Sequence, residues 1–251
     1  MASPRRLADG LGERLAEIRG RIRAAEQASG RPPEAVEIVV AAKYLDAADL
    51  PALAEHGLTT LGENRTDELA AKQRAAESLG LAPQLTWDFI GPLQSRKARD
   101  VVGRVRLLHA VERESAVEQL HRRAPEGSTI EALVEVNVAD DPAKSGILPR
   151  TLADFLDATA AFERVRFLGL MTMPPIASDP ADARRPFAAL RELASTHAPG
   201  WAGRHQLDRH LSMGTSADFE AAVAEGATLV RLGRGLLFGG QDTPSPGRKA
   251  A

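Results

Sequence analysis

The chain has 251 residues, 43% of them apolar and 26% charged, and 32 basic against 34 acidic residues leave a formal net charge of −2. This composition is typical of a soluble globular protein with a substantial core, and the near-balance of charge argues against nucleic-acid binding as the main function. The absence of cysteine excludes disulfides, thiolate zinc sites and cysteine nucleophiles. No apolar run reaches the roughly 18 residues of a membrane span and no signal peptide is recognised, which predicts a cytoplasmic protein without a membrane partner.

The first predicted element is a helix. Apolar residues recur at helical spacing from Leu7 to Ile22 among arginines and glutamates, and the Pro32-Pro33 pair ends the pattern. Residues 36–42 follow as a short β-branched run, which predicts a buried strand. Lys43 stands at the C-terminal end of this strand.

Strands and helices then alternate along the chain. Counting the first, eight strands are predicted, at residues 36–42, 59–62, 85–90, 106–110, 132–138, 165–170, 206–211 and 228–232. Helices are predicted between them at 47–56, 66–79, 97–102, 114–122, 152–162, 183–196 and 217–225. Strands joined by such helices imply right-handed parallel crossovers, and eight of them in about 250 residues predict an α/β protein with a single (β/α)8 TIM barrel.

The two ends of the chain frame this barrel. Only a short glycine-rich segment follows the eighth strand, so the opening helix is expected either to cover the barrel bottom or to replace the missing last helix. The expected division is a helix at 1–30 packed on the barrel, the barrel at 31–240 and a flexible tail at 241–251. Residues 174–180 and 198–203 are predicted loops, and no long linker divides the chain.

Lys43 is the first candidate functional residue. Side chains alternate along a strand, so Val39, Ala41 and Lys43 share one face, and a lysine that ends an apolar face points toward the barrel mouth. Active sites of these barrels lie at that C-terminal end of the strands. The alternative is a surface lysine that extends its amine into solvent.

Two further segments fall at the same rim. Gly62-Glu63-Asn64 follows the second strand, where Asn64 belongs either to the site or only to the N-cap of the next helix. Leu211-Ser212-Met213-Gly214-Thr215-Ser216 follows the seventh strand and precedes a helix. Its small residues leave backbone N–H groups available for a phosphate, unless Thr215 and Asp218 form a plain capping motif.

An arginine on the eighth strand completes the set. Arg231 shares a strand face with Leu229 and Gly233, so it is expected to point inward. A lysine on strand one, a phosphate-binding turn after strand seven and this arginine are together the parts of a pyridoxal phosphate site. The lysine forms a Schiff base with the aldehyde, and the arginine faces the pyridine nitrogen. No metal site is predicted, because His205 and His210 lack a third ligand at metal-binding spacing.

The sequence also resembles a known family. Seven segments carry the resemblance in chain order: VVAAKY at 39–44, GEN at 62–64, WDFIGPLQSRK at 87–97, EVNV at 135–138 with KSG at 144–146, GLMTM at 169–173, LSMGTS at 211–216 and VRLG at 230–233. They resemble the motifs of the pyridoxal phosphate homeostasis proteins, also called the YggS or proline-synthase co-transcribed family. The match extends from about Ile38 to Gly239.

The resemblance implies a barrel like the N-terminal domain of alanine racemase, with pyridoxal 5′-phosphate bound to Lys43 as an internal aldimine. It also implies that Asn64 lies beside the cofactor and that Arg231 meets the pyridine nitrogen. The residues that it assigns to the phosphate are Ser212, Gly214, Thr215, Ser216 and Gly233.

Three residues depart from the family pattern. The family often has histidine where Asp88 stands, a hydroxyl residue where Ala42 stands before the lysine, and a small hydroxyl residue where Arg234 stands. Asp88 would bring negative charge near the rim of strand three if it points inward. Arg234 either strengthens phosphate binding through its charge or faces solvent.

The expected function is homeostasis of pyridoxal phosphate: the protein holds the cofactor and buffers it or passes it to apo-enzymes that depend on it. Little or no catalysis is expected, because an arginine at the ring nitrogen disfavours protonation and weakens the cofactor as an electron sink. The resemblance favours a monomer.

Two alternatives stay open. An amino-acid racemase of the same fold needs a second acid/base group opposite the lysine, whereas the only tyrosine, Tyr44, adjoins Lys43. An interaction scaffold that has lost its cofactor predicts no bond to Lys43 at all.

Overall fold

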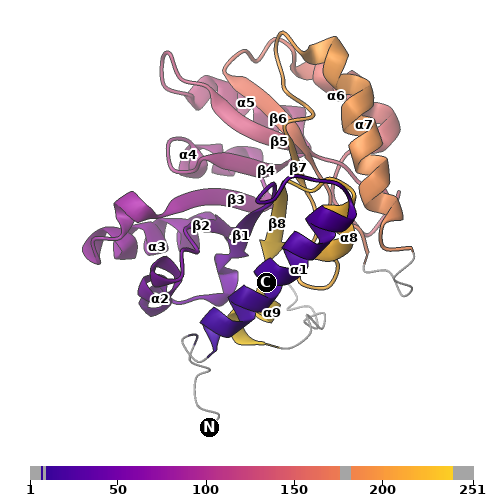
Figure 1. Cartoon of the computed structure of the whole chain (residues 1–251). Coiled ribbons are helices and arrows are strands. Elements are labelled where there is room, and N and C mark those ends of the chain that lie inside the picture. The colour runs from indigo at the N-terminus through magenta and orange to yellow at the C-terminus, as the bar shows by residue number, and fades with distance from the viewer. Residues whose placement is uncertain (1–6, 8–9, 176–181, 240–251) are drawn as a thin grey trace.

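The computed structural model describes residues 7, 10–175 and 182–239, which include a closed barrel of eight parallel strands in sequence order (Figure 1). The strands are β1 Glu37–Ala41, β2 Thr60–Glu63, β3 Thr86–Pro92, β4 Leu107–Val111, β5 Ile130–Glu135, β6 Val165–Met171, β7 His210–Ser212 and β8 Leu229–Leu232. Each strand pairs in parallel with the next, and β8 pairs with β1 to close the ring. The predicted α/β TIM barrel is confirmed.

Helices cover the outside of the barrel (Figure 1). They are α1 Leu11–Ala28, α2 Leu50–Glu55, α3 Thr66–Ser78, α4 Ala98–Val101, α5 Glu114–Arg123, α6 Leu152–Thr159, α7 Arg185–Trp201, α8 Phe219–Ala224 and α9 Arg234–Phe238. Five single 3-10 turns lie at Ala42–Tyr44, Ala47–Asp49, Ala82–Gln84, Ser95–Lys97 and Pro149–Thr151. No helix in the described ranges is long and apolar enough to cross a membrane.

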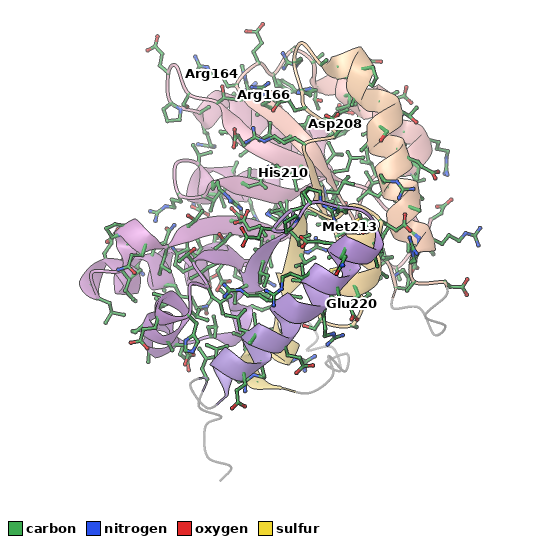
Figure 2. The ribbon with its side chains drawn as sticks, in the orientation of Figure 1. Arg164, Arg166, Asp208, His210, Met213 and Glu220 are labelled. Atoms are coloured by element: carbon green, nitrogen blue, oxygen red, sulfur yellow. The ribbon has the colours of Figure 1, made fainter. Side chains whose placement is uncertain are left out.

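Helix α1 takes the place of the missing last helix. It packs against α8 and α9, and Arg21 forms an ion pair of 2.7 Å with Glu220 of α8, which Figure 2 shows beside α1. Arg14 donates a hydrogen bond of 2.8 Å to the carbonyl oxygen of Leu236 in α9. This packing favours the second of the two expected positions, in place of the missing last helix. The expected tail, 241–251, lies outside the described residues, as does most of the predicted loop at 174–180.

Two predicted boundaries are wrong by several residues. Helix α7 continues through Pro199 to Trp201, where a loop was expected. Trp201 stacks on His205 at 5.4 Å and His205 meets the edge of Phe167 at 5.1 Å, so packing holds the end of the helix in spite of the proline. Strand β7 is only three residues long, although six were expected.

The core has two layers, because alternate side chains of each strand point in and out of the barrel. The larger layer lies between strands and helices. The smaller layer lies inside the barrel and consists of Val39, Leu107, Ala110, Leu133, Leu168, Met171 and Leu229, with Ile90 packed against it. Several polar residues are buried with it, including Asp88, His109, Glu135, Ser212 and Arg231. The barrel interior is therefore apolar only in part, and its polar side chains form the lower part of the site.

Candidate functional site

Lys43 lies just past the end of β1, in the single turn Ala42–Tyr44. Its side chain is exposed, with Nζ 4.9 Å from the centre of the Tyr44 ring. Ala42 is fully buried, and its carbonyl oxygen accepts a hydrogen bond of 3.0 Å from Nζ of Lys72. Lys72 is paired in turn with the buried carboxylate of Glu63. The Lys43 amine is thus exposed for reaction, while the buried Lys72 fixes the backbone of the preceding residue, Ala42.

The turn after β7 lies at the same end of the barrel as Lys43. The N–H of Gly233 donates to the hydroxyl of Ser216 at 3.4 Å, which joins this turn to the segment after β8. A Cβ atom on Gly233 would lie 2.8 Å from Cε2 of Tyr44, so the tyrosine ring packs directly on this glycine. The guanidinium of Arg234 lies 5.4 Å from the same ring. Tyr44 therefore connects Lys43 with the turn across one rim.

Gly214 sets the shape of the turn. Its φ of 92° lies in the left-handed region, and a Cβ atom there would lie 2.6 Å from Cβ of Ala222 in α8. Its carbonyl oxygen accepts a hydrogen bond of 3.0 Å from the N–H of Arg231. Only glycine fits this conformation and this close approach without strain.

Thr215 and Asp218 are bonded to each other at the turn. Both the N–H and the hydroxyl of Thr215 donate to Oδ1 of Asp218, at 2.6 and 3.0 Å, and Asp218 is the N-cap of α8, but its side chain caps none of the N–H groups of the helix. Helix α8 begins at Phe219, two residues later than predicted. The N–H groups of Ser216 and Ala217 donate to none of the residues that the structure describes. These two N–H groups of the loop are therefore available to an anion.

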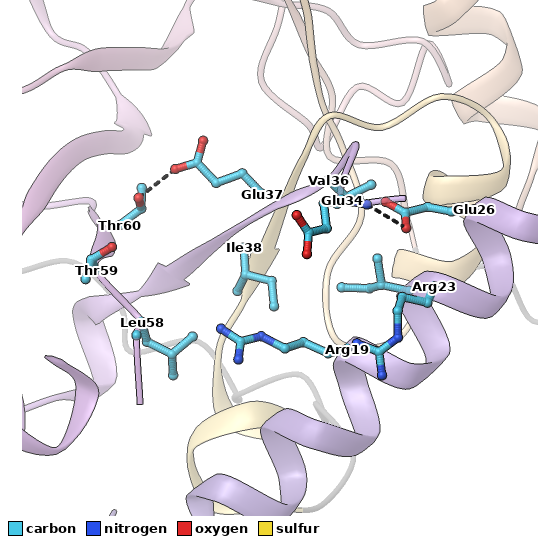
Figure 3. Close-up of a pocket in the computed structure, with 12 residues that line it drawn as sticks. Arg19, Arg23, Glu26, Glu34, Val36, Glu37, Ile38, Leu58, Thr59 and Thr60 are labelled. Carbon is cyan, nitrogen blue, oxygen red and sulfur yellow. Dashed lines mark hydrogen bonds between the residues drawn. The ribbon is translucent and has the colours of Figure 1, made fainter. Parts of the chain in front are cut away.

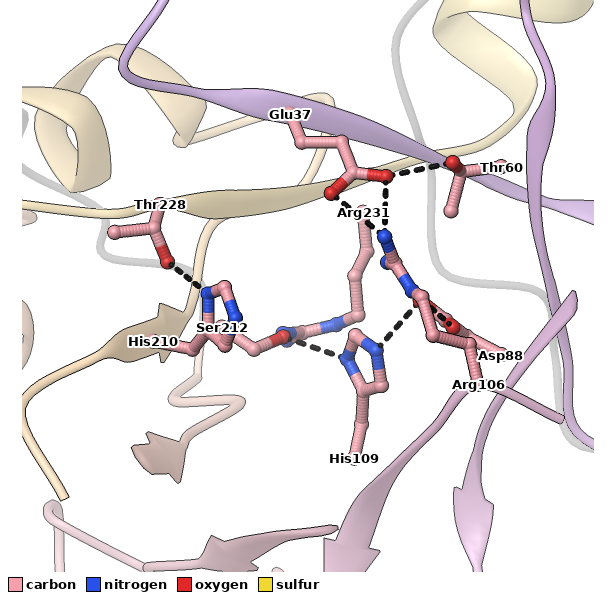
Figure 4. Close-up of polar contacts among 9 residues, drawn as sticks. All are labelled: Glu37, Thr60, Asp88, Arg106, His109, His210, Ser212, Thr228 and Arg231. Atoms are coloured by element: carbon pink, nitrogen blue, oxygen red, sulfur yellow. Dashed lines mark hydrogen bonds and ion pairs between the residues drawn. The ribbon is translucent and has the colours of Figure 1, made fainter. Parts of the chain in front are cut away.

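Arg231 points into the barrel below this turn (Figure 4). Its guanidinium donates to the hydroxyl of Ser212 at 2.6 Å and to the carbonyl oxygen of Thr172 at 2.9 Å. Neither acceptor is charged, and no carboxylate of the described residues pairs with Arg231. Burial lowers the pKa of Arg231 to about 10, so it is still protonated at neutral pH. Arg231 is thus a buried cation that forms no ion pair within the described residues, although the nearby carboxyl groups of Asp218 and Glu135 oppose the lowering of its pKa.

His109 connects the hydroxyl of Ser212 with Asp88. Its Nδ1 lies 2.9 Å from Oγ of Ser212, and its Nε2 lies 3.1 Å from Oδ2 of Asp88 (Figure 4). Burial lowers the pKa of His109, so the ring is neutral. Burial opposes ionisation of Asp88, but hydrogen bonds from His109 and Arg106 hold the pKa of that carboxyl below its ordinary value.

These charge states fix the protons along the chain. Because the Asp88 carboxylate only accepts, Nε2 of His109 carries the hydrogen, and Nδ1 is left to accept from the hydroxyl of Ser212. That hydroxyl in turn accepts from Arg231. Serine, histidine and aspartate in this order suggest a hydrolase triad. Ser212 is fully buried and held by Arg231, however, so the three residues orient the guanidinium and leave no exposed nucleophile.

This arrangement places two residues named in the sequence analysis. The hydroxyl of Ser212 is bonded to Arg231 and His109, and a role for Ser212 at the phosphate stays a prediction. Asp88 points into the barrel and receives two hydrogen bonds from Arg106, at 3.0 and 2.7 Å. Arg106 also donates to both carboxylate oxygens of Glu37, at 3.0 Å each, toward the other end of the barrel.

Asn64 follows β2 at the rim, and its side chain is exposed. Helix α3 begins at Thr66 with Arg65 as N-cap, so the alternative that Asn64 caps this helix is wrong. The backbone of Asn64 lies against β3, because a Cβ atom on Gly91 would lie 2.7 Å from its carbonyl oxygen. The side chain is thus available for a ligand.

Glu135, like His109, was not among the candidate site residues selected from the sequence. It ends β5, is only 6% exposed, and its Oε2 accepts no hydrogen bond from the described residues. Burial and the neighbouring Glu112 raise the pKa of Glu135 to about 7, although Arg231 acts in the opposite direction. Its alternation with Leu133 on β5 was the only signal in the sequence that it faces inward.

A cavity of about 550 Å³ lies at the other end of the barrel (Figure 3). It is lined by α1, by the start of β1 and by the loop before β2, and includes Arg19, Glu34 and Thr60. None of the candidate residues lines it. Within the described ranges, no group of three or more histidines or carboxylates is arranged to hold a metal ion.

Comparisons with known proteins agree with this geometry. The family described as alanine racemase, N-terminal domain, matches residues 14–241. The pyridoxal phosphate homeostasis protein of Aquifex aeolicus is 36% identical over 235 residues, which cover 90% of this chain and 96% of that protein. The chain belongs to the pyridoxal phosphate homeostasis protein family. The protein of the same name from Escherichia coli K12 is 34% identical and covers 92% of this chain and 97% of its own length.

Solved structures of this family have the same barrel. PipY of Synechococcus elongatus PCC7942 without PLP gives a TM-score of 0.78 at 34% identity, over 91% of this chain and all of that one. PipY with PLP bound gives a TM-score of 0.76 at 32% identity, with the same coverage. In the present member of the pyridoxal phosphate homeostasis family, the expected site residues come from the ends of β1, β2, β7 and β8, which all lie at one rim.

Proposed function

We propose that this protein binds pyridoxal 5′-phosphate at the rim formed by the ends of β1, β2, β7 and β8, and that it stores the cofactor and releases it. The observation that carries the proposal is the position of Lys43 on the same rim as the Ser212–Ser216 turn, with the buried cation Arg231 beneath the turn. An amine, anion-binding backbone and a donor for the ring nitrogen are what this cofactor requires of a protein.

The residues fit the parts of the cofactor one by one. Lys43 supplies the amine that bonds to the aldehyde carbon. The N–H groups of Ser216 and Ala217, which have no described acceptor, supply donors for the phosphate, with Gly233 beside them. Arg231 supplies a donor for the pyridine nitrogen, and Asn64 lies at the neighbouring strand end.

Storage rather than turnover follows from the state of Arg231. Its guanidinium is held by Ser212 and Thr172 and keeps its own proton at neutral pH. A donor of this kind leaves the ring nitrogen unprotonated, so the cofactor withdraws electrons weakly when bound. We infer a non-catalytic carrier, with an amino-acid racemase as the alternative. Conversion of L-alanine to D-alanine by the loaded protein is expected to be negligible, and sustained turnover would favour the racemase.

The binding proposal is tested by trapping the covalent link. The protein is mixed with pyridoxal 5′-phosphate, reduced with borohydride and digested, and the peptides are weighed. A phosphopyridoxyl group is expected on Lys43 and lost in Lys43→Ala. The matched control Lys97→Ala removes a half-exposed lysine that follows β3 and is expected to keep the adduct. An unmodified Lys43 peptide would contradict the proposal and favour the scaffold alternative.

Three finer points remain predictions of the same proposal: that apo-enzymes receive the cofactor, that the protein is a cytoplasmic monomer, and that residues 31–240 form the barrel unit with helix 1–30 packed on it. Equilibrium sedimentation of the loaded protein checks whether it is a monomer. Mixing the loaded protein with an apo-enzyme and measuring the activity that appears checks whether the cofactor is passed on.

A further inference from the structure

Glu135 lies across the barrel mouth from Lys43. In a closed ring of eight strands in sequence order, β5 is four strands from β1 in either direction and is thus its opposite. Lys43 follows the last residue of β1, and Glu135 is the last residue of β5. Because all strands are parallel, both residues belong to the same end of the barrel.

The side chain of Glu135 faces the barrel interior and is incompletely bonded. Leu133, two residues earlier on the same face, packs inside the barrel with Val39 and Leu229. Oε2 of Glu135 is buried without a hydrogen-bond partner among the described residues. The charged groups that face it are Glu112, after β4, and Arg231, on β8.

Neither of these groups competes for the role of proton acceptor. Glu112 accepts a hydrogen bond from the N–H of Gly146 and another from Arg113, so it is engaged in holding the loop after β5. Arg231 already donates to Ser212 and Thr172. Glu135 is a buried carboxyl group at the mouth with an oxygen that accepts no hydrogen bond from the described residues, and a carboxyl that titrates near neutral pH serves well as an acid and base there.

Release of a cofactor held by an amine requires a second amine. Such an amine is an ammonium ion at neutral pH and cannot attack a carbon until it loses a proton. We propose that Glu135 is the residue that takes this proton, so that the pair of Lys43 and Glu135 hands the cofactor to a primary amine. This inference rests on the proposed binding of pyridoxal phosphate to Lys43 and names the class of acceptor, which is an alkyl ammonium group such as a lysine side chain.

The proton and the bonds balance without a further reactant. The incoming ammonium gives one proton to the carboxylate of Glu135, and its nitrogen bonds to the carbon that is doubly bonded to Nζ of Lys43. While both nitrogens are on that carbon, the two protons left on the incoming nitrogen pass to Nζ, the C–Nζ bonds break and the incoming nitrogen takes over the double bond. Glu135 returns the first proton to Nζ, so Lys43 leaves as an ammonium: one ammonium enters and one ammonium remains.

The test compares wild type, Glu135→Gln and Glu131→Gln. Glu131 is four residues earlier on β5, so the control makes the same substitution near the opposite end of the strand. Each loaded protein is mixed with excess ethylamine between pH 6 and pH 9, and loss of the bound-cofactor absorption is timed. Glu135→Gln is expected to slow release by about 100-fold at pH 8, as removal of a general base does, and Glu131→Gln by less than about 2-fold. Equal rates for wild type and Glu135→Gln would overturn the inference.

The pH profile separates base catalysis from a structural effect. The wild-type rate is expected to fall below pH 7 as Glu135 becomes protonated, and the rate of Glu135→Gln to lack this step. Glu135→Asp retains a carboxylate with a shorter reach, so it is expected to keep the pH step at a lower rate, and it also serves if the glutamine variant does not fold. Loss of the step in Glu135→Asp would count against the assignment.

A measurement without the cofactor completes the test. The carboxyl carbons of glutamate are labelled with carbon-13, and the signal missing from Glu135→Gln is followed with pH by NMR. Titration near pH 7 is expected, whereas a midpoint near the ordinary glutamate value would overturn the inference. Absence of the borohydride adduct on Lys43 is a different outcome, because it contradicts the binding proposal itself and leaves this titration unaffected.

Discussion

Glu135→Gln should make the cofactor-free protein more stable at alkaline pH. The pKa of Glu135 is raised from its ordinary value of 4.5 to about 7, because the carboxyl is buried and faces Glu112. At about 1.4 kcal/mol per pKa unit, the ionised carboxyl costs the folded state about 3 kcal/mol above pH 7. Its 6% exposure leaves little solvent to screen this cost.

The direction follows from proton uptake. Between pH 4.5 and pH 7 the folded protein keeps a proton on Glu135 that the unfolded chain has lost, so stability is highest at low pH and falls as pH rises through 7. Glutamine has no proton to lose. The free energy of unfolding of Glu135→Gln, minus that of wild type, should therefore increase by about 3 kcal/mol from pH 5 to pH 8.

Urea unfolding at several pH values, followed by fluorescence of Trp87 and Trp201, measures this difference. Changes in other titrating groups cancel between the two proteins, and Glu131→Gln gives the baseline for a glutamine on the same strand. A difference that stays constant from pH 5 to pH 8 would refute the reasoning, because it would mean that Glu135 ionises as easily in the folded protein as in the unfolded chain.

Three other substitutions test the rim and the chain beneath it. Lys43→Ala should abolish the bound-cofactor absorption and change the free energy of unfolding by less than about 0.5 kcal/mol, because its side chain is exposed; insoluble protein would make Lys43 structural. His109→Leu should lower the free energy of unfolding, measured in urea, by about 1–3 kcal/mol and weaken cofactor binding in equilibrium dialysis, because it removes the hydrogen bonds that link Ser212 to Asp88. Unchanged binding would show that His109 does not support the site. Gly214→Ala should cost about 1–3 kcal/mol through its φ of 92°, whereas Gly200→Ala, with open space around it, should cost nothing; equal effects would contradict the strain.

The barrel was predictable from local pattern. Short β-branched runs alternating with amphipathic helices identify strands and helices without any knowledge of their partners, and parallel connection then leaves a closed ring as the simplest arrangement. The short strand β7 and the helix through Pro199 were not predictable in this way. Their boundaries depend on contacts between residues far apart or in different elements, such as the stacking of Trp201 on His205.

The candidate site was predictable from strand ends and from alternation along one strand. Lys43, Asn64 and the Ser212–Ser216 turn stand at or just after strand ends, where position alone suggests a role, and alternation along β8 predicted that Arg231 points inward. His109, Asp88 and Glu135 lie within or at the end of strands, and nothing local shows that three different strands bring them toward Arg231. Their pKa directions depend on burial and on partners in or next to β3, β4 and β8, which come together only in the folded chain.

The chain from Glu37 through Arg106, Asp88 and His109 to Arg231 has an evolutionary consequence. Asp88 and His109 are fully buried, so a substitution at either one leaves its neighbour with an unpaired charge or an unbonded hydrogen that water does not reach. Substitutions at these positions are therefore expected to occur together, because a new residue at one position is tolerated only after its neighbour has changed. Covariation among these barrel positions, rather than invariance of any single one, is the trace that such a core should leave in the family's descendants.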